Sequence, residues 1–111
     1  MKTKIFFIER STNFNNNDLN SPKIAGSEKT LINITNELAL NKDLIIKIFN
    51  NTENENKFEN LEWLNIKEIK KYNNPDFLIA MSDANLLSFI DCENKFLWSH
   101  SVQTIEKFIR K

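Results

Sequence analysis

Ala25-Gly26-Ser27-Glu28 organises the rest of this sequence, because it stands between a polar loop and the most amphipathic segment of the chain. The apolar residues that follow recur with helical spacing, at Leu31, Ile34, Leu38 and Ala39. Ser27 is the expected N-cap, and Glu28 suits the helix dipole. Gly26 is the only glycine of the chain, and a residue without a side chain lets a phosphate approach the free N–H groups of a helix start. The stretch therefore predicts a helix that begins at a phosphate site.

Apolar strands and helical segments alternate around this helix. Nearly continuous apolar runs predict strands at 4–8, 44–49, 61–66, 77–81 and 95–98. Helices or helical turns are predicted from 27 to a break at 41–43, and at 67–72, 84–90 and 101–110; the stretches 11–23 and 50–60 predict loops. Asn41 is expected to end the first helix in the left-handed conformation. This order indicates an α/β fold, a Rossmann-like parallel sheet with helices on both faces.

Length and composition narrow the function classes. The chain has 111 residues, which predicts that residues 1–111 form a single domain. It has 15 basic and 15 acidic residues, and this balance gives no reason to expect a nucleic-acid partner. The apolar runs are too short for a membrane span or a secretory signal, and the single cysteine fits a reducing compartment, so a cytoplasmic location is expected. One histidine and one cysteine make no zinc site, and we expect no metal and no cofactor. The abundant asparagines are interpreted as a bias of the source genome.

Ligands of open parallel sheets bind outside the carboxyl ends of the strands. Four segments are expected to reach that edge: the loop 9–26, the turn after Phe49, Ser82-Asp83, and Ser99-His100-Ser101. His100 is the only imidazole and has either a structural role or a role in binding a sugar hydroxyl or a phosphate. Asp83 is able to accept a ligand hydroxyl, although an N-cap is the favoured interpretation. Asp91-Cys92-Glu93 is expected to be a polar turn at the opposite edge.

Three segments resemble the group 1 glycosyltransferases, the retaining family 4 of the two-Rossmann-domain type. Residues 25–39 resemble the Gly-Gly-x-Glu, Leu-x-Asn-Leu-Ala-x-Glu-Leu-Ala segment of that family, residues 74–80 its Pro-Asp-hydrophobic strand, and residues 96–101 its strand ending in histidine. They occur in the family's order and span nearly the whole chain. Ala25 replaces the first glycine of the family's pair, and Asn41-Lys42-Asp43 replaces its usual Gly-His turn.

The resemblance implies transfer, with retention and without a bound metal, of a sugar from a UDP- or GDP-linked donor to a lipid, glycan or other envelope acceptor. It assigns Gly26, Ser27 and Ser99 to donor binding, with the Gly26 amide at the diphosphate. It makes His100 the catalytic residue beside the donor sugar. It places Asn13 and Asn17, in a loop that admits acceptor, and Asp83 on the acceptor side.

The same resemblance implies that residues 1–111 are the first part of the acceptor-side domain. The second, donor-binding domain of the family is not in this sequence, so the chain alone is expected to be inactive. A second hypothesis is a non-catalytic binding or interaction module that self-associates through an exposed sheet edge. A third is an unrelated flavodoxin-like or receiver-like domain.

Two pairs of basic residues, Lys70-Lys71 and Arg110-Lys111, have two interpretations. They are either isolated surface charge, which is the commoner explanation, or a peripheral contact with the inner face of a membrane.

Overall fold

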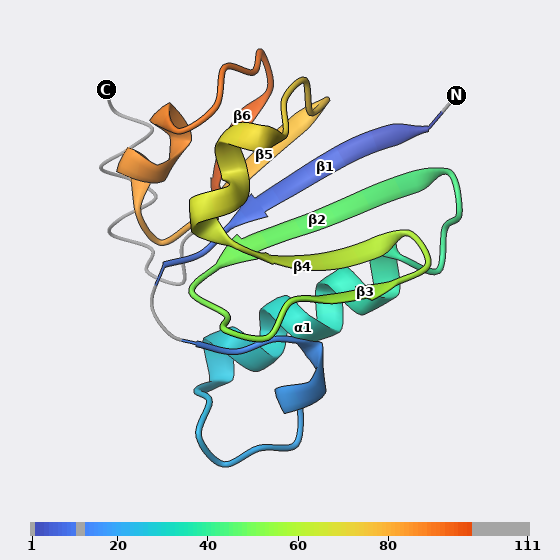
Figure 1. Ribbon diagram of the computed structural model, residues 1–111, viewed down its shortest axis with the longest axis vertical. Coiled ribbons are helices and arrows are strands. Elements are labelled where there is room, and N and C mark those ends of the chain that lie inside the picture. Colours follow the sequence, from blue (N-terminus) through green and yellow to red (C-terminus); the bar gives the residue numbers. More distant parts are fainter. Residues whose placement is uncertain (1, 11–12, 99–111) are drawn as a thin grey trace.

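The computed structural model of the protein describes residues 2–10 and 13–98, and its centre is a six-stranded sheet (Figure 1). The strands are β1 (Thr3–Ile8), β2 (Leu44–Asn50), β3 (Asn56–Phe58), β4 (Leu61–Asn65), β5 (Phe77–Met81) and β6 (Lys95–Trp98). They lie in the order β3-β4-β2-β1-β5-β6. Every neighbouring pair is parallel except β3 and β4, which are antiparallel. The five strands expected from the sequence are confirmed, each within one residue at either end.

The parallel strands follow the Rossmann-like order. β1 is central, β2 and then β4 lie on one side of it, and β5 and then β6 lie on the other. The chain therefore reverses its direction of travel across the sheet between β1 and β5, which is the topological switch point of such folds. The inner strands are covered on both faces, because Phe6, Phe7 and Ile8 follow one another in β1 and all are at most 1% exposed.

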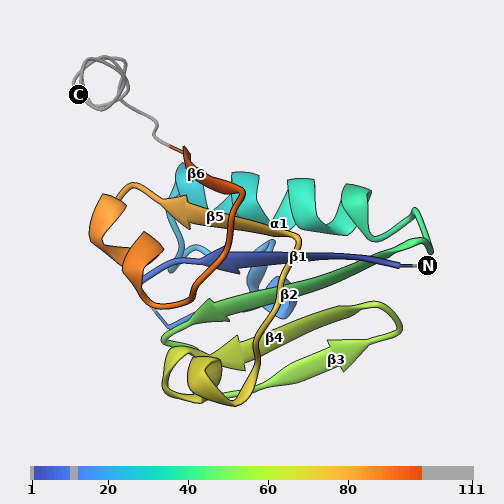
Figure 2. The same ribbon diagram turned by 90° about the horizontal axis from the view of Figure 1, so that it is seen from above.

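One helix and one loop cover the first face of the sheet. The helix α1 (Gly26–Leu38) runs along this face (Figure 2), where Leu31 and Ile32 pack against Phe7 and Ile48. The loop before α1 adds Phe14, whose ring meets the indole of Trp63 edge to face at a centroid distance of 5.4 Å. The predicted loop 11–23 thus contributes to the core, in the part that the structure describes.

The second face is covered by short 3-10 segments. η2 (Ile66–Lys71) and η3 (Ala84–Ser88) bring Ile69 and Leu86 against Phe6, Phe49 and Leu78. A third 3-10 turn, η1 (Asn16–Asp18), belongs to the loop of the first face. The expected α/β fold with a mostly parallel sheet is confirmed. Helices on both faces are not shown, because within residues 2–10 and 13–98 the only α-helix is α1. The predicted segment 67–72 forms η2, which ends at Lys71 with the extended Tyr72 as its C-cap. The helix predicted at 101–110 lies outside the described residues.

Both ends of α1 differ from the prediction. The N-cap is Ala25 and not Ser27, because Ala25 has extended dihedrals and its N–H donates to Glu28 Oε1 at 3.2 Å. Asn41 does not take the left-handed conformation; its Oδ1 accepts from the Asp43 N–H at 3.0 Å and forms a polar turn. The Glu28 side chain thus caps the start of the helix, whereas the helix ends with its C-cap Ala39, whose N–H donates to the Thr35 carbonyl at 3.0 Å, before the Asn41 turn.

The antiparallel strand β3 lies in the segment 50–60, which was predicted to be a loop. Its sequence, Asn56-Lys57-Phe58, has no apolar run, and Glu59 in the following turn has φ 53° without the glycine that usually marks such a turn. Pairing with β4, rather than local preference, makes this segment a strand.

Candidate functional site at the switch point

An open cavity of about 340 Å³ lies at the switch point, where β1 and β5 end side by side. It is lined by Glu9 and Arg10, which follow β1, and by Met81 and Asp83 at the end of β5. Ile8 pairs with Ala80, so these two strand ends are fixed in register. The cavity is therefore at the position where α/β sheets of this order bind ligands.

Arg10 and Glu9 give the cavity one exposed cation and one buried carboxylate. The guanidinium of Arg10 lies 5.6 Å from the centroid of the Phe89 ring. The backbone carbonyl of Arg10 accepts a hydrogen bond from Asn51 Nδ2 at 2.8 Å. Glu9 is 7% exposed, and its N–H donates to the Phe49 carbonyl at 2.9 Å. A guanidinium held over an aromatic ring keeps its N–H groups available for an anion. Neither residue was a predicted site residue, although two charged residues directly after the central strand were the available signal.

The β5 side of the cavity combines backbone strain with a helix cap. Ser82 has φ 63°, a left-handed conformation that is uncommon for a non-glycine residue. Its N–H donates to the Trp98 carbonyl at 2.8 Å, which holds the strained residue against β6. Asp83 Oδ1 accepts from the Asn85 N–H at 3.0 Å, so the favoured N-cap interpretation is confirmed. One carboxylate oxygen of Asp83 is thereby committed to η3.

Gly26 stands at the start of α1, at the same edge of the sheet as the carboxyl ends of the strands (Figure 2). Its backbone φ is not positive, and a Cβ built on it would meet no other atom within 4 Å. Neither backbone conformation nor tight packing therefore requires glycine here. The first backbone bond of the helix runs from the Lys29 N–H to the Ala25 carbonyl, so the amides of Gly26 and Ser27 precede that ladder.

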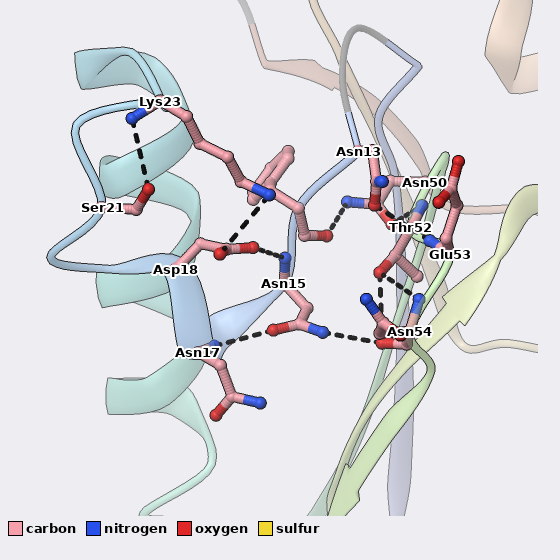
Figure 3. A network of polar contacts seen from close by, with 11 residues as sticks. Asn13, Asn15, Asn17, Asp18, Ser21, Lys23, Asn50, Thr52, Glu53 and Asn54 are labelled. Atoms are coloured by element: carbon pink, nitrogen blue, oxygen red, sulfur yellow. Dashed lines mark hydrogen bonds and ion pairs between the residues drawn. The ribbon is translucent and has the colours of Figure 1, made fainter.

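Asparagine side chains tie the loop before α1 to the loop after β2 (Figure 3). Asn13 Oδ1 accepts from the Glu53 N–H at 2.9 Å, and Asn15 Nδ2 donates to the Asn54 carbonyl at 2.7 Å. Asn50 is fully buried, and its Nδ2 donates to the Phe14 carbonyl at 2.8 Å. The asparagines that were attributed to genome bias therefore include structural residues.

Of the two predicted acceptor-side asparagines, Asn13 has its side-chain oxygen in a hydrogen bond, and Asn17 is exposed. Asn13 Oδ1 accepts a hydrogen bond from the Glu53 N–H. The backbone N–H of Asn17 donates to Asn15 Oδ1 at 2.8 Å. Ser99 and His100 lie outside the described residues, so the distance between Gly26 and His100 stays a prediction. The Asp91-Cys92-Glu93 turn precedes β6 and lies at the amino edge, as expected.

No family model, curated protein or solved structure matches this chain. The likeness to the glycosyltransferases thus rests on the three segments named above. Within residues 2–10 and 13–98, no three His, Cys, Asp or Glu side chains converge in the manner of a metal site. The same part of the chain has no helix with the length and apolarity to cross a bilayer.

Proposed function

We propose that this chain is the acceptor-side, Rossmann-like part of a retaining glycosyltransferase that takes a nucleoside diphosphate sugar. The observation that carries the proposal is the cavity at the switch point, lined by the ends of β1 and β5. Its position suits a ligand that extends from the strand ends toward the start of α1. The three segments that resemble the family supply the chemical class of the ligand.

The donor diphosphate is proposed to lie against the first turn of α1. Gly26 leaves room for a phosphate oxygen, and the amides of Gly26 and Ser27 are not used by the helix ladder. Arg10 supplies the cation that a diphosphate requires at the strand edge. As the sugar is transferred, N–H donors already fixed in position would stabilise the charge of the departing diphosphate.

The remaining roles follow from the resemblance. His100 is proposed to bond the donor sugar beside the reacting carbon, with Ser99 next to it. Asn17 and the second carboxylate oxygen of Asp83 are proposed to face the acceptor, and Asn13 to hold the loop that carries Asn17. The resemblance assigns most nucleotide contacts to a second domain, so we expect weak donor binding and no turnover by residues 1–111 alone. A lipid acceptor would bring the protein to the cytoplasmic face of a membrane.

Amide NMR titration with UDP-glucose and GDP-mannose tests this proposal. We expect shift changes at residues 9–10, 26–27 and 82–83. The variant Gly26→Ala should keep the fold, because its Cβ has free space, yet should weaken donor binding by about tenfold through contact with the diphosphate. Ala25→Val is the matched control, since residue 25 is also exposed and precedes the helix.

Shifts confined to regions remote from Gly26, or equal losses for Gly26→Ala and Ala25→Val, would contradict the proposal. A switch-point ligand of another class would appear as shifts at residues 9–10 and 82–83 that neither nucleotide sugar produces. Adding uridine diphosphate without the sugar separates diphosphate recognition from sugar recognition.

A non-catalytic interaction module is the second candidate, and the sheet edges favour it. The outer strands β3 and β6 carry the exposed aromatic residues Phe58 and Phe96, which are 66% and 52% exposed. Exposed strand edges with apolar side chains promote association. Sedimentation over a concentration series is expected to show self-association that Phe58→Ser or Phe96→Ser weakens. A monomer at all concentrations would remove this candidate.

A further inference from the structure

The part of the chain that the structure describes leaves half of the second face of the sheet uncovered. η2 and η3 cover the carboxyl ends of the strands, whereas the amino-terminal halves of β1, β2 and β4 lie open toward the viewer in Figure 1. A groove of about 570 Å³ occupies this open half. Its volume is in the range of small-molecule sites, and it lies away from the cavity at the switch point.

The groove has an apolar floor and a basic rim. Ile45 of β2 forms part of the floor, whereas the buried side chain of Ile46 packs on the first face of the sheet. Five lysines from four different segments line it, namely Lys2, Lys4, Lys42, Lys47 and Lys57, together with the carboxylates Glu59 and Glu62. A chain with no net charge thus gathers an excess of positive charge in one concave place.

The strand register explains why these side chains meet. Side chains alternate between the faces of a strand, so Lys4 lies on the same face as Phe6, and Lys47 on the same face as Phe49. Lys47 is opposite Glu62 across β2 and β4, and Glu62 is opposite Lys57 across β4 and β3. Glu62 therefore lies between two lysines and forms an ion pair with one of them, since its Oε1 is 2.6 Å from Lys47 Nζ.

The two carboxylates leave part of the charge uncompensated. Lys42 pairs with Glu59, and Lys47 pairs with Glu62. Within the described part of the chain, Lys2, Lys4 and Lys57 have no carboxylate within 4.0 Å. These three lysines give the lining of the groove positive charge that its two carboxylates do not offset, and a ligand with clustered negative charge suits such a lining.

The rim of the groove is held in place before any ligand binds. Asn60 Nδ2 donates to the carbonyls of Asn41 and Leu44 at 3.1 and 2.8 Å. These bonds fasten the turn that carries Lys42 to the turn that carries Glu59. The Lys4 N–H donates to Asp76 Oδ2 at 2.8 Å, which fixes β1 at its start. Little reorganisation is then needed to bring the lysines together.

We propose that this groove binds a small molecule with two or three clustered phosphate groups. Lysine ammonium groups are compact charges that suit phosphate, and the concave shape suits an inserted ligand better than a flat surface. The site is separate from the donor site of the proposed function, because it lies on the amino-terminal half of the second face. It would also remain if the donor assignment failed.

Inorganic tripolyphosphate is the first probe. We expect it to shift the amides of β1 to β4 around the groove, whether or not it also occupies the proposed diphosphate site at residues 26–27. Shifts at residues 26–27 alone would overturn the proposal. The double variant Lys4→Gln/Lys57→Gln should weaken binding by about tenfold, because both substitutions remove uncompensated charge from the rim. The control Lys67→Gln/Lys70→Gln removes the same charge from exposed positions of η2 outside the groove and should weaken binding less than twofold. Circular dichroism checks that both variants fold.

The second probe separates a soluble ligand from a lipid headgroup. Vesicles of phosphatidylcholine, with and without phosphatidic acid, are tested for binding and for competition with tripolyphosphate. Competition that depends on Lys4 and Lys57 supports the phosphate site with a lipid as its source. Binding to vesicles without any effect of tripolyphosphate, equal losses for the two double variants, or no shift in the groove at millimolar tripolyphosphate would each overturn the proposal.

Discussion

The two faces of the sheet are buried by different means. The first face is covered by α1 and by a loop that has little regular secondary structure, yet Phe14 of this loop is fully buried against Trp63. The second face is covered by two 3-10 segments and only over its carboxyl half, where Ile69 and Leu86 pack. The loop can enter the core because the side chains of Asn50 and Asn15 satisfy its backbone groups, the Phe14 carbonyl and the Asn17 N–H. Among residues 2–10 and 13–98 no such loop packs on the second face, and the half that they leave uncovered carries charge.

The largest effect that tests this comparison is expected at Phe14. Because its ring is fully buried, Phe14→Ala should lower the free energy of unfolding by about 3–5 kcal/mol. Phe58→Ala is the control, since that ring is 66% exposed, and its effect should stay within about 0.5 kcal/mol. Urea unfolding followed by tryptophan fluorescence measures both. Similar small losses in the two variants would mean that the loop is not part of the core.

The next effect concerns the asparagine bonds of the first face. Asn50→Ala removes a donor to the Phe14 carbonyl and an acceptor for the Thr52 N–H, both buried, and should cost about 1–3 kcal/mol. Asn51→Ala removes an exposed bond to the Arg10 carbonyl and should cost about 0.5 kcal/mol. Hydrogen exchange should show faster exchange at residues 13–18 in Asn50→Ala alone. Unchanged exchange there would show that the loop is held by Phe14 without the asparagine.

These bonds also explain what the sequence predicted and what it did not. The strands were predictable because each is a nearly continuous apolar run, a signal contained within four to six residues. Asn50 and Phe14 are 36 positions apart, and Asn13 and Glu53 are 40 apart, so no local pattern reveals these partners. The asparagines consequently looked like compositional bias. β3 was missed for the same reason, since only its pairing with β4 makes it a strand.

The candidate site divides in the same way. Asp83 as an N-cap was predictable, because a cap bonds an N–H two residues along the chain. Arg10 and Glu9 were not singled out, because their importance comes from the neighbouring end of β5, which follows some 70 positions later. The strain at Ser82 carried no sequence signal either, since serine gives no indication of a left-handed backbone. Strand order, and not residue type, is what makes these residues a site.

A smaller effect is expected at Ser82, where the switch point stores backbone strain. Glycine adopts a positive φ without steric cost, so Ser82→Gly should raise the free energy of unfolding by about 0.5–1 kcal/mol. Ser88→Gly in η3 should lower it, because that serine has helical backbone and its Oγ donates to the Asn85 carbonyl at 2.8 Å. Thermal unfolding of the two variants distinguishes the signs. A loss of stability in Ser82→Gly would show that its hydroxyl matters more than its backbone.

The smallest effect concerns Tyr72 on the covered half of the second face. Burial raises the pKa of its phenol above the ordinary value of 10.0, and the carboxylates of Glu62, Glu55 and Glu68 raise it further. Because the folded-state pKa is higher than the unfolded one, the phenol contributes stability that is fully present below pH 10 and is lost as the pH rises through the folded pKa. The chain has one tyrosine, so phenolate absorbance reports this group alone.

Titrating the folded chain and the same chain in denaturant should give the higher midpoint in the folded state. Glu62→Gln should bring the folded midpoint closer to the denatured one, while Glu53→Gln, which changes a carboxylate outside this group, should not. Equal midpoints in the folded and denatured chain would mean that Tyr72 is not buried against Phe49. The rings of Tyr72 and Phe49 have centroids 5.6 Å apart. If Tyr72 were not buried there, a larger part of the second face would be open than this packing indicates.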